Sequence, residues 1–312
     1  MPSATKQPSM RNDHASTTAG DPTALARSVR PRSLWAQAWR AYRRDRVAVI
    51  AAGLIFVVVL AALLAPIISP YPPNDAVNEL RLAGPGTAGH PLGMDEQGRD
   101  ILSRVIWGGR VSLPIALLPT SISTLIGLAL GVMAGFRGGF IGATIMRVMD
   151  VLFAFPVVIL AIGIAGVFGP SMTNVMLSLA IVLVPYITRV AYAATVETRG
   201  REYIHAAQAS GATAARLMVV HVLPNILPPL IVYSTTIVGL MVVYGAGLSF
   251  LGLGIQPPTA DWGIMASAGR EVLSTAPHVS TIPGVVILVV ALSFNLVGDG
   301  LRDALDPRGH LR

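Results

Sequence analysis

Long apolar runs separated by polar loops form the pattern of hydrophobic and polar positions along this chain. Residues 47–69, 111–136, 151–188, 225–252 and 280–298 carry no charged side chain. Because about 20 apolar residues cross a bilayer as a helix, each run predicts a membrane span. The run 151–188 is long enough for two spans and has a natural break at Phe168-Gly169-Pro170-Ser171. The pattern therefore predicts an all-α, polytopic membrane protein with six transmembrane helices.

Composition supports this class and excludes several others. Hydrophobic residues make up 53% of the 312 positions and charged residues only 12%, too few to cover a soluble domain with a polar surface. The chain contains no cysteine, which excludes disulfides, iron–sulfur clusters and thiolate catalysis. No secretory signal peptide is expected at the start, because the first apolar run begins only at Val47.

The polar stretches complete a predicted division of the chain. Trp35, Trp39 and Tyr42 follow helical spacing beside several arginines, which is typical of an amphipathic helix at an anionic membrane surface. Such a helix could brace the bundle or simply anchor it. The expected segments are a disordered cytoplasmic tail (1–32), the interfacial helix (33–46), the first span (47–69), an external segment (70–110), a five-helix core (111–301) with a cytoplasmic loop at 198–225, and a second cytoplasmic tail (302–312).

Basic residues indicate which side of the membrane each loop occupies. With a cytoplasmic amino terminus, 18 of the 23 lysine and arginine residues fall in inside segments. This agrees with the tendency of cytoplasmic loops to carry positive charge. Both termini and the stretch Tyr203–Asn225 are therefore expected inside. The net charge of +7 then reflects membrane topology, and nucleic acid is not an expected partner.

The inner stretch Tyr203–Asn225 is unusually slim. Its small residues predict a short helix followed by a break at Gly211, since alanine favours helices and glycine ends them readily. A surface with so little side-chain bulk allows a groove of another protein to close around the backbone. The alternative is an ordinary alanine-rich loop helix.

The same stretch resembles the cytoplasmic EAA loop of ATP-binding-cassette importer permeases. His205-Ala206-Ala207 takes the place of the first triplet, with histidine replacing the usual glutamate, and Val222-Leu223-Pro224 takes the place of its end. The resemblance implies a coupling helix seated in a cleft of a separate ATPase subunit. The residues implied in coupling are Tyr203, His205, Ala206, Ala207, Ser210, Gly211 and Pro224.

Three further stretches resemble the C-type membrane subunit of dipeptide, oligopeptide and nickel importers. They are HPLGMDEQGRDILSRVIWGGRVSL (90–113), GLSFLGLGIQPPTADWGIM (247–265) and FNLVGDGLRDALDPR (294–308). The resemblance implies the MetI-like fold of type I importer permeases in a prokaryotic cell membrane. The implied partners are a second, B-type permease subunit, two ATP-binding subunits or one fused ATPase, an extracytoplasmic substrate-binding protein and membrane lipid.

Two of these stretches contain candidate residues at the external end. Asp95, Arg99 and Asp100, together with Arg104, can pair at helical spacing and hold an external interfacial helix at the mouth of the bundle. The alternative is a solvated charged face. In the second stretch, Gly252, Gly254 and the Pro257-Pro258 pair predict a sharp exit from the fifth span.

Structure is then expected to restart at Asp261 and Trp262, near the outer membrane interface that tryptophan favours. Both regions are interpreted as an external gate or a docking surface for a binding protein.

Few polar residues lie within the spans. Asn295 lies in the sixth, and Asp150 lies at the inner end of the third, where Arg147 can neutralise it; both are candidates for polar positions on the pathway or within the bundle. No carboxylate falls near the middle of a span, which argues against an ion-coupled carrier. The chain has no phosphate-binding GxxxxGK[ST] loop and no metal-ligand spacing among its six histidines. We therefore expect no enzyme activity, no metal and no cofactor in this chain, with ATP and Mg²⁺ bound by the partner ATPase.

The sequence thus predicts the permease subunit of an ATP-driven importer for di- or oligopeptides, forming half of the translocation path. A nickel or other small-solute importer of the same family is the first alternative. A self-contained secondary carrier and a non-transporting scaffold are alternatives from other classes. The identity of the substrate stays open at this stage.

Overall fold

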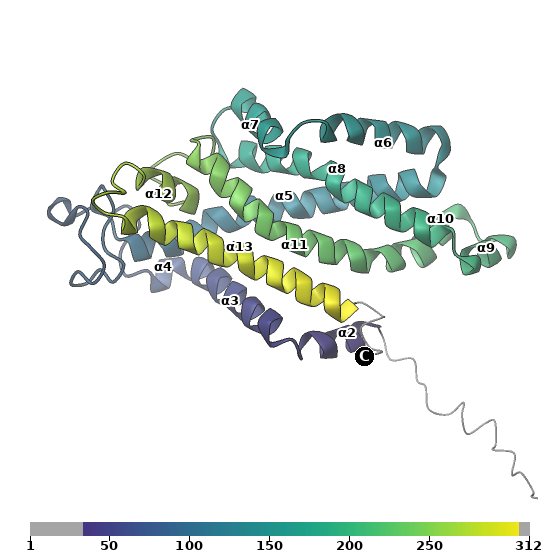
Figure 1. The fold of residues 1–312 in the computed structure, drawn as a ribbon, viewed down its shortest axis with the longest axis horizontal. Coiled ribbons are helices and arrows are strands. Elements are labelled where there is room, and N and C mark those ends of the chain that lie inside the picture. The colour runs from purple at the N-terminus through teal and green to yellow at the C-terminus, as the bar shows by residue number, and fades with distance from the viewer. Residues whose placement is uncertain (1–33, 306–312) are drawn as a thin grey trace, which may run out of the picture.

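The computed structural model describes residues 34–305 and consists of helices that run side by side along one long axis (Figure 1). Five of these helices are long and apolar enough to cross a membrane by themselves. They are α3 (Arg46–Leu63), α5 (Ile101–Arg137), α8 (Met172–Arg199), α11 (Leu223–Phe250) and α13 (His278–Leu305). The predicted tail 1–32 and the end of the second tail, 306–312, lie outside the described residues.

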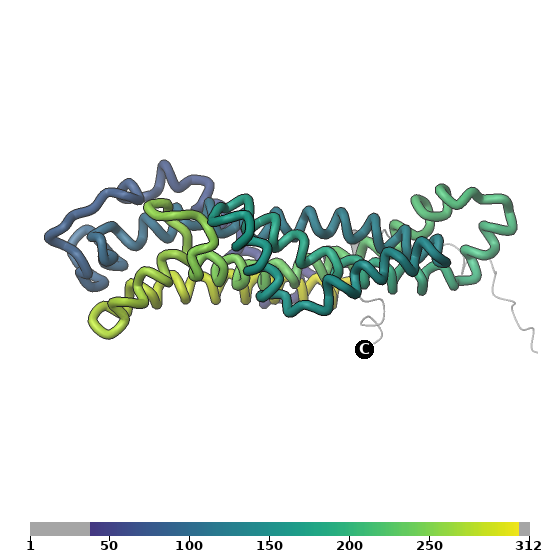
Figure 2. Tube along the Cα trace, turned by 90° about the horizontal axis from the view of Figure 1, so that it is seen from above, coloured from purple at the N-terminus to yellow at the C-terminus, as the bar shows by residue number. Residues whose placement is uncertain are grey.

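Shorter elements cap the two ends of this bundle. One end carries the segment from residue 69 to 100 and α12, and the opposite end carries α9 and α10 (Figures 1 and 2). The shorter elements are α2 (Leu34–Tyr42), α4 (Ala65–Ile68), η1 (Asn78–Leu80), α6 (Gly139–Phe153), α7 (Val157–Phe168), α9 (Glu202–Ala209), α10 (Ala214–Arg216), the π-helical η2 (Leu217–Val222) and α12 (Trp262–Ala268).

The third predicted span, residues 151–168, falls on two helices rather than one. The structure has α6 and α7 instead, bent by 87° at a break between them, and they make a sixth span only when counted as one pair. Pro156 stands at the start of α7. Because proline disfavours helical backbone in the residue before it, the chain turns at Phe155. Hydropathy alone could not reveal this turn, since both helices are apolar.

Several other helices extend beyond their apolar runs. α5 begins at Ile101, inside the predicted external segment 70–110, and α13 continues to Leu305, past the predicted boundary at 301. A helix of 37 residues such as α5 is about 55 Å long, against about 30 Å for the hydrocarbon of a bilayer. The apolar run therefore marks only the membrane-embedded part of each helix, and its polar ends project from the bilayer.

Close packing of α5 against α8 forms the centre of the bundle. Gly127, Gly131 and Gly135 line one face of α5 at four-residue spacing, and all three are buried. A methyl group at Gly131 would lie 2.5 Å from Cβ of Ala191 and 2.6 Å from the Thr188 carbonyl oxygen. Only glycine fits at these positions, because the two backbones approach too closely for a side chain.

We expect Gly131→Leu to disrupt this packing and destabilise the folded protein by about 1–3 kcal/mol, the usual cost of overfilling a tight interior. Thermal unfolding of the purified protein in detergent measures the effect. Gly163→Leu is the matched control, because Gly163 is a helical glycine of α7 with no neighbouring atom within 4 Å of the position that a Cβ atom would occupy. Equal unfolding temperatures for the two variants would contradict the assignment of this interface.

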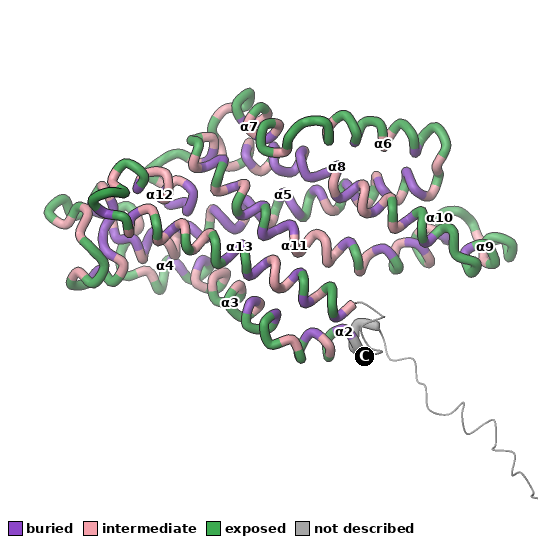
Figure 3. The backbone as a smooth tube through the Cα atoms, viewed as in Figure 1, coloured by how far each residue is buried: buried purple, intermediate pink, exposed green. Residues whose placement is uncertain are grey.

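The outer surface of the bundle is strongly apolar. Ile50 and Ile67 near the amino terminus and Phe140 in α6 are 72%, 79% and 86% exposed. Exposed residues line much of α3, α6 and α7 (Figure 3). Such a surface is unfavourable in water and suits the acyl chains of a bilayer or a neighbouring membrane subunit.

α2 is attached to the bundle at the end that carries α9. Its buried residues Ala38 and Tyr42 pack with Ala48 of α3 and Ala304 of α13, and the Tyr42 hydroxyl donates to the Ala48 carbonyl at 3.2 Å. Trp39 faces outward, 57% exposed, with the Arg43 guanidinium over its ring. The packing favours the bracing interpretation of this helix, and the outward tryptophan leaves its role at the membrane surface as a prediction.

Candidate functional site

The external end contains a buried network of charged side chains, and it differs from the predicted helix. Residues 90–100 form turns, and helix α5 starts only at Ile101. Asp95 lies at the centre of the network. One carboxylate oxygen accepts the backbone N–H groups of Gln97 and Arg99, and the other accepts the Arg99 Nε–H at 2.7 Å. Asp95 is only 4% exposed, so the alternative of a solvated charged face is also wrong.

Arg104 connects three separate segments at this end. Its Nε lies 3.4 Å from the Asp95 carboxylate, and its Nη1 donates to the carbonyl oxygens of Pro73 at 2.9 Å and Pro258 at 3.3 Å. The Arg104 side chain is 2% exposed. This single guanidinium therefore holds the start of the external segment, the Asp95 turn and the Pro257-Pro258 loop together, which a planar group with several donors can do.

Asp100 fixes the start of α5. One of its carboxylate oxygens accepts the Ser103 backbone N–H at 2.7 Å, which satisfies a free donor in the first turn of the helix. The other lies 2.9 Å from Nδ1 of His90, a residue that the sequence interpretation did not single out. Asp100 and His90 are both buried, so their role in this structure is to hold the turn rather than to meet a partner.

The exit from α11 agrees with the sequence pattern. α11 ends at Phe250, and Gly252 has a φ of +79°, a backbone conformation that glycine adopts without strain. A side chain at Gly254 would collide with Ser249. After the Pro257-Pro258 turn, Asp261 caps α12 by accepting the Ile264 backbone N–H at 3.0 Å.

Asp261 and Trp262 are both buried in the protein. Asp261 accepts the Ser112 hydroxyl at 2.7 Å, and the Trp262 indole N–H donates to the Val105 carbonyl at 2.9 Å. Burial raises the pKa of the Asp261 carboxyl, while the hydrogen bonds from Ser112 and Ile264 oppose that rise. Each residue is 1% exposed, so Trp262 packs inside the protein, and its expected position near the outer membrane interface stays a prediction.

Two motif segments that are distant in sequence interlock here. A methyl group at Gly108 would lie 2.8 Å from the Trp262 ring, and one at Gly109 would lie 3.4 Å from it. The paired glycines of the 90–113 stretch thus make room for the tryptophan of the 247–265 stretch. The external candidates thus form one packed assembly, and the expected role of this assembly as a gate or a docking surface stays a prediction.

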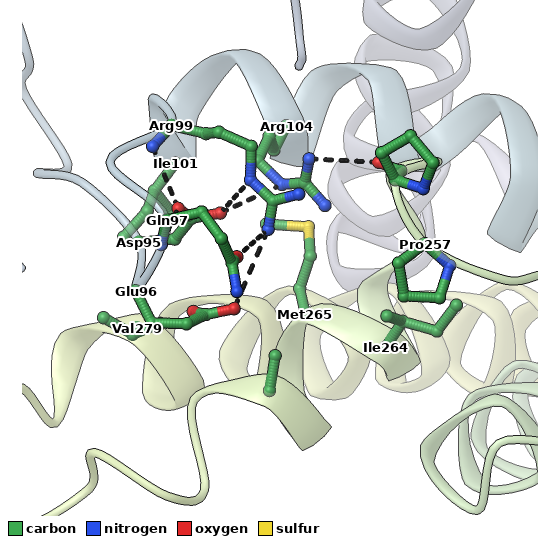
Figure 4. A pocket seen from close by; sticks show the side chains of 12 residues that line it. Asp95, Glu96, Gln97, Arg99, Ile101, Arg104, Pro257, Ile264, Met265 and Val279 are labelled. Atoms are coloured by element: carbon green, nitrogen blue, oxygen red, sulfur yellow. Dashed lines mark hydrogen bonds and ion pairs between the residues drawn. The ribbon is translucent and has the colours of Figure 1, made fainter. Parts of the chain in front are cut away.

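A cavity of about 240 Å³ opens within this assembly. Asp95, Arg99 and Arg104 line one side, and Pro257 with Ile264 and Met265 lines the other (Figure 4). The charged side chains on its wall pair with one another, since the Asp95 carboxylate lies 2.7 Å from Nε of Arg99 and 3.4 Å from Nε of Arg104. The cavity lies between two loops, and Arg104 contacts both of them, through Asp95 and through the Pro258 carbonyl.

A second cavity, of about 160 Å³, lies between α7, α8 and α11 near the middle of the bundle. Three tyrosines from two helices line it, Tyr186 of α8 and Tyr233 and Tyr244 of α11. The rest of its wall is apolar, with Leu183 and Met241 among the lining residues. No charged side chain of the described residues is part of this wall.

Asp150 pairs with Arg189 of α8 at 2.5 Å, and not with Arg147 one turn before it. The Arg189 guanidinium also lies over the Phe153 ring, 4.1 Å from its centroid, and Phe153 lies 4.5 Å from the Tyr186 ring. The break between α6 and α7 is thereby connected to the tyrosine-lined cavity. Sequence spacing favoured Arg147 because it considers only near neighbours, whereas the partner is on another helix.

Asn295 occupies the middle of α13 and is half-buried. Its side-chain oxygen faces α11 at Gly239, where an added methyl group would lie 3.0 Å from it. Asn295 is not among the residues that line the 160 Å³ cavity. Its predicted role as a pathway residue therefore lacks a geometric basis, and the alternative of a polar contact within the bundle fits its position.

The opposite end of the molecule presents α9 as a narrow projection (Figures 1 and 2). Ile204 is buried and fastens the helix, whereas Tyr203, His205 and Ala206 are exposed and Ala207 is half-buried. The Ser210 hydroxyl donates to the Ala206 carbonyl at 2.9 Å and closes the last turn. The exposed side of α9 thus combines the small side chains of Ala206 and Ala209 with the larger ones of Tyr203 and His205.

The chain reverses directly after α9. Gly211 has a φ of +85°, and no atom lies within 4 Å of the position that its side chain would occupy. α10 and η2 then lead back into α11, in which Pro224 stands in the first turn. Tyr203 lies beside His221 with ring centroids 6.4 Å apart. All seven predicted coupling residues belong to this one projection, although their function in coupling stays a prediction.

The sequence interpretation missed four residues of the central region. Tyr186, Tyr233 and Tyr244 line the cavity, and Arg189 pairs with Asp150. A signal for them was present. Tyr233 and Tyr244, with Ile237 and Met241 between them, recur at helical spacing within an otherwise apolar run. A hydropathy pattern groups tyrosine with the apolar residues. The hydroxyl groups on this face of α11 were therefore overlooked.

The geometry defines a polytopic helical membrane protein. The helix α9 projects from one end, and the packed loops of residues 69–100 and α12 cover the other. Residues 127–310 match the family described as "Binding-protein-dependent transport system inner membrane component". Residues 33–85 match "N-terminal TM domain of oligopeptide transport permease C". The first match covers more than half of the chain, so the chain belongs to the family of inner-membrane components of binding-protein-dependent transport systems.

Similar proteins extend over almost the same length. The di/tripeptide transport system permease protein DppC of Pseudomonas aeruginosa is 42% identical over 277 residues, covering 86% of this chain and 91% of that protein. The dipeptide transport system permease protein DppC of Alkalihalophilus pseudofirmus is 38% identical, covering 88% and 90%. The glutathione transport system permease protein GsiD of Pectobacterium atrosepticum is 37% identical, covering 89% and 92%.

A solved structure supports the fold. The MetNI methionine ABC transporter, in an inward-facing conformation, aligns with a TM-score of 0.55 and 19% identity, covering 65% of this chain and 96% of that one. The predicted MetI-like permease fold and the resemblance to C-type permease subunits are confirmed by these matches. The chain is a multi-pass inner-membrane transport subunit, as the names of its relatives and its apolar helices indicate.

Proposed function

We propose that this chain is the C-type membrane subunit of an ATP-driven importer for small peptides. The observation that carries the proposal is the projection formed by α9 and the turn at Gly211, a short, largely exposed helix in which Ile204 is the one buried residue. Such a helix suits a cleft in another subunit. The substrate class rests on the relatives, which are named as permeases for di- and tripeptides, dipeptides and glutathione.

The proposed assembly contains two membrane subunits that enclose the path. A second, B-type permease covers the apolar and tyrosine-lined side of this chain, and two ATP-binding subunits, or one fused ATPase, receive the α9 projections. Nucleotide and Mg²⁺ bind there and not in this chain. An extracytoplasmic binding protein delivers the peptide to the end formed by α12 and residues 69–100.

In this assembly the ATPase supplies all of the free energy. ATP binding draws the two ATPase subunits together. The α9 of this chain, and the equivalent helix of the second permease, move with the ATPase subunit in which each is bound. The displacement passes through η2, which is continuous with α11, and so reaches a helix that lines the central cavity. Hydrolysis reverses the movement and releases the peptide inward. Both termini and α9 are proposed to be cytoplasmic, as the distribution of basic residues favours.

Reconstitution of the complex tests this function. The chain is co-expressed with the proteins encoded beside it, purified, and inserted into liposomes together with the binding protein. We expect ATPase subunits to co-purify and a labelled dipeptide to accumulate only when ATP is present. Uptake by this chain alone, driven by an ion gradient and indifferent to ATP, would overturn the proposal in favour of a secondary carrier.

Two further outcomes separate the remaining alternatives. Uptake of a nickel chelate in preference to peptides would retain the ATP-driven mechanism and replace the substrate. Co-purification without any substrate-stimulated ATP hydrolysis would indicate a scaffold rather than a transporter. A matched sample with an ATPase variant that binds but does not hydrolyse ATP serves as the control for leakage.

A further inference from the structure

Three tyrosines from two facing helices converge on the central cavity. Tyr233 and Tyr244 lie on one stripe of α11, eleven residues apart, and Tyr186 faces them from α8. Eleven residues of helix correspond to about 16 Å along the bundle axis. The three phenol groups therefore cover about half of the hydrocarbon thickness of a bilayer.

The hydroxyl groups of these tyrosines have no partner within residues 34–305. Their side chains are half-buried, yet none of the three hydroxyl oxygens is among the enclosed polar atoms that lack a hydrogen bond. Each hydroxyl oxygen is therefore not fully enclosed by the described residues, and all three side chains line the cavity. Several other hydroxyl groups in these helices are paired inside the bundle, for example Ser178, which donates to the Asn174 carbonyl at 2.7 Å, whereas Thr188 and Ser249 are enclosed without a partner among the described residues and do not line the cavity.

An unpaired hydroxyl in a membrane interior is costly unless it meets water or a polar ligand. Phenylalanine would supply the same ring without that cost. Three such hydroxyls on one cavity wall, at the depth of the acyl chains, point to a polar occupant. Acyl chains and a purely apolar protein contact would both leave these groups unsatisfied.

We propose that Tyr186, Tyr233 and Tyr244 form a row of hydrogen-bonding contacts for the amide groups of a small peptide on its way through this subunit. The inference rests on the proposed function and adds the residues that meet the substrate. A phenol hydroxyl both donates and accepts, so it can pair with either the N–H or the C=O of a peptide bond.

The rest of the wall explains how different peptides could pass. Charged residues are absent from the described lining, so neither acidic nor basic side chains are held by an ion pair. Met241 is unbranched and flexible, which lets the apolar part of the wall adapt to side chains of different shape. The row thus recognises the peptide backbone and tolerates variation in the side chains.

Cysteine accessibility tests this assignment, because the natural chain contains no cysteine. Tyr186→Cys, Tyr233→Cys and Tyr244→Cys are each assembled into the complex and treated with a charged methanethiosulfonate reagent, which needs an aqueous route. We expect labelling of all three on this subunit's band in a gel, and protection by a dipeptide. Leu288→Cys is the control, since Leu288 is 64% exposed on α13 and belongs to the apolar outer surface. Labelling of Leu288→Cys alone, or of none of the three tyrosine positions, would overturn the proposal.

Hydroxyl removal provides a second test. Each of Tyr186→Phe, Tyr233→Phe and Tyr244→Phe is expected to lower the maximal rate of peptide uptake about three- to tenfold, the usual effect of one lost hydrogen bond. Assembly and basal ATP hydrolysis should stay unchanged. Tyr192→Phe is the matched control, because Tyr192 lies on α8 away from the cavity lining.

The two levels of the proposal fail differently. If the wild-type complex shows no ATP-driven peptide uptake, the proposed function is wrong. If the wild-type complex transports peptide and all three phenylalanine variants transport equally well, the tyrosine row is wrong and the proposed function stands.

Discussion

Gly211→Trp is expected to abolish ATP-driven uptake while the protein still reaches the membrane at its normal level. No atom lies within 4 Å of the side-chain position at Gly211, so the isolated chain has room for an indole. A cleft closed around the α9 projection would not have that room. Uptake into liposomes, measured together with ATP hydrolysis, should show hydrolysis that no longer drives transport.

Two companion variants separate bulk from backbone strain. The φ of +85° at Gly211 is unfavourable for most side chains by about 1–2 kcal/mol, whereas asparagine tolerates it better. Gly211→Asn should therefore retain most of the uptake. Ala206→Trp places the same bulk on the exposed side of α9 without strain and should abolish uptake as Gly211→Trp does. Unchanged uptake by both tryptophan variants would show that α9 is not the coupling element.

Arg104→Ala is expected to give the largest loss of stability at the external end. The substitution leaves Asp95 with one cation fewer and removes the shared donor of the Pro73 and Pro258 carbonyl oxygens. Breaking a buried ion pair by removing one partner costs about 3–5 kcal/mol. Thermal unfolding in detergent and the yield of folded protein should both fall clearly.

The controls for this prediction come from the same helix. Arg110→Ala removes an exposed arginine six residues further along α5 and should change stability little. Arg104→Lys keeps the charge and should remain well below the wild type, because an ammonium cannot reach three segments at once. A normal unfolding temperature for Arg104→Ala would show that the interlocked loops are held by packing of Trp262 alone.

The class of protein could be predicted from the sequence because a membrane span is a local property. About 20 consecutive apolar residues suffice to mark one, and the chain supplied those runs without reference to any distant residue. The slim helix before Gly211 was predictable for the same reason, since helix propensity and a glycine stop act over a few residues. The positions of these elements along the chain could therefore be predicted from the sequence.

Contacts between distant segments could not be predicted from the sequence in this way. The pairing of Asp150 with Arg189, the packing of Gly108 on Trp262 and the contacts of Arg104 with Pro73 and Pro258 each join residues that are 31 or more positions apart. Sequence spacing offered nearer partners, such as Arg147 for Asp150, and helical neighbours for the external charges. The bend at Pro156 likewise accompanies the packing of α6 and α7 against α8. The sequence shows the proline but not this packing.

The membrane class, the apolar centres of the helices and the slim inner loop all follow from the residues in order, because hydropathy and helix propensity are sums over neighbours. The burial of Asp261 and Trp262, and the shared cavity of Tyr186, Tyr233 and Tyr244, emerge only from the packing of the helices. The physical reason is that burial and hydrogen-bond satisfaction depend on what other helices bring to the same place. A tyrosine counts as apolar along the chain, and its unpaired hydroxyl acquires meaning only when the opposite wall is known.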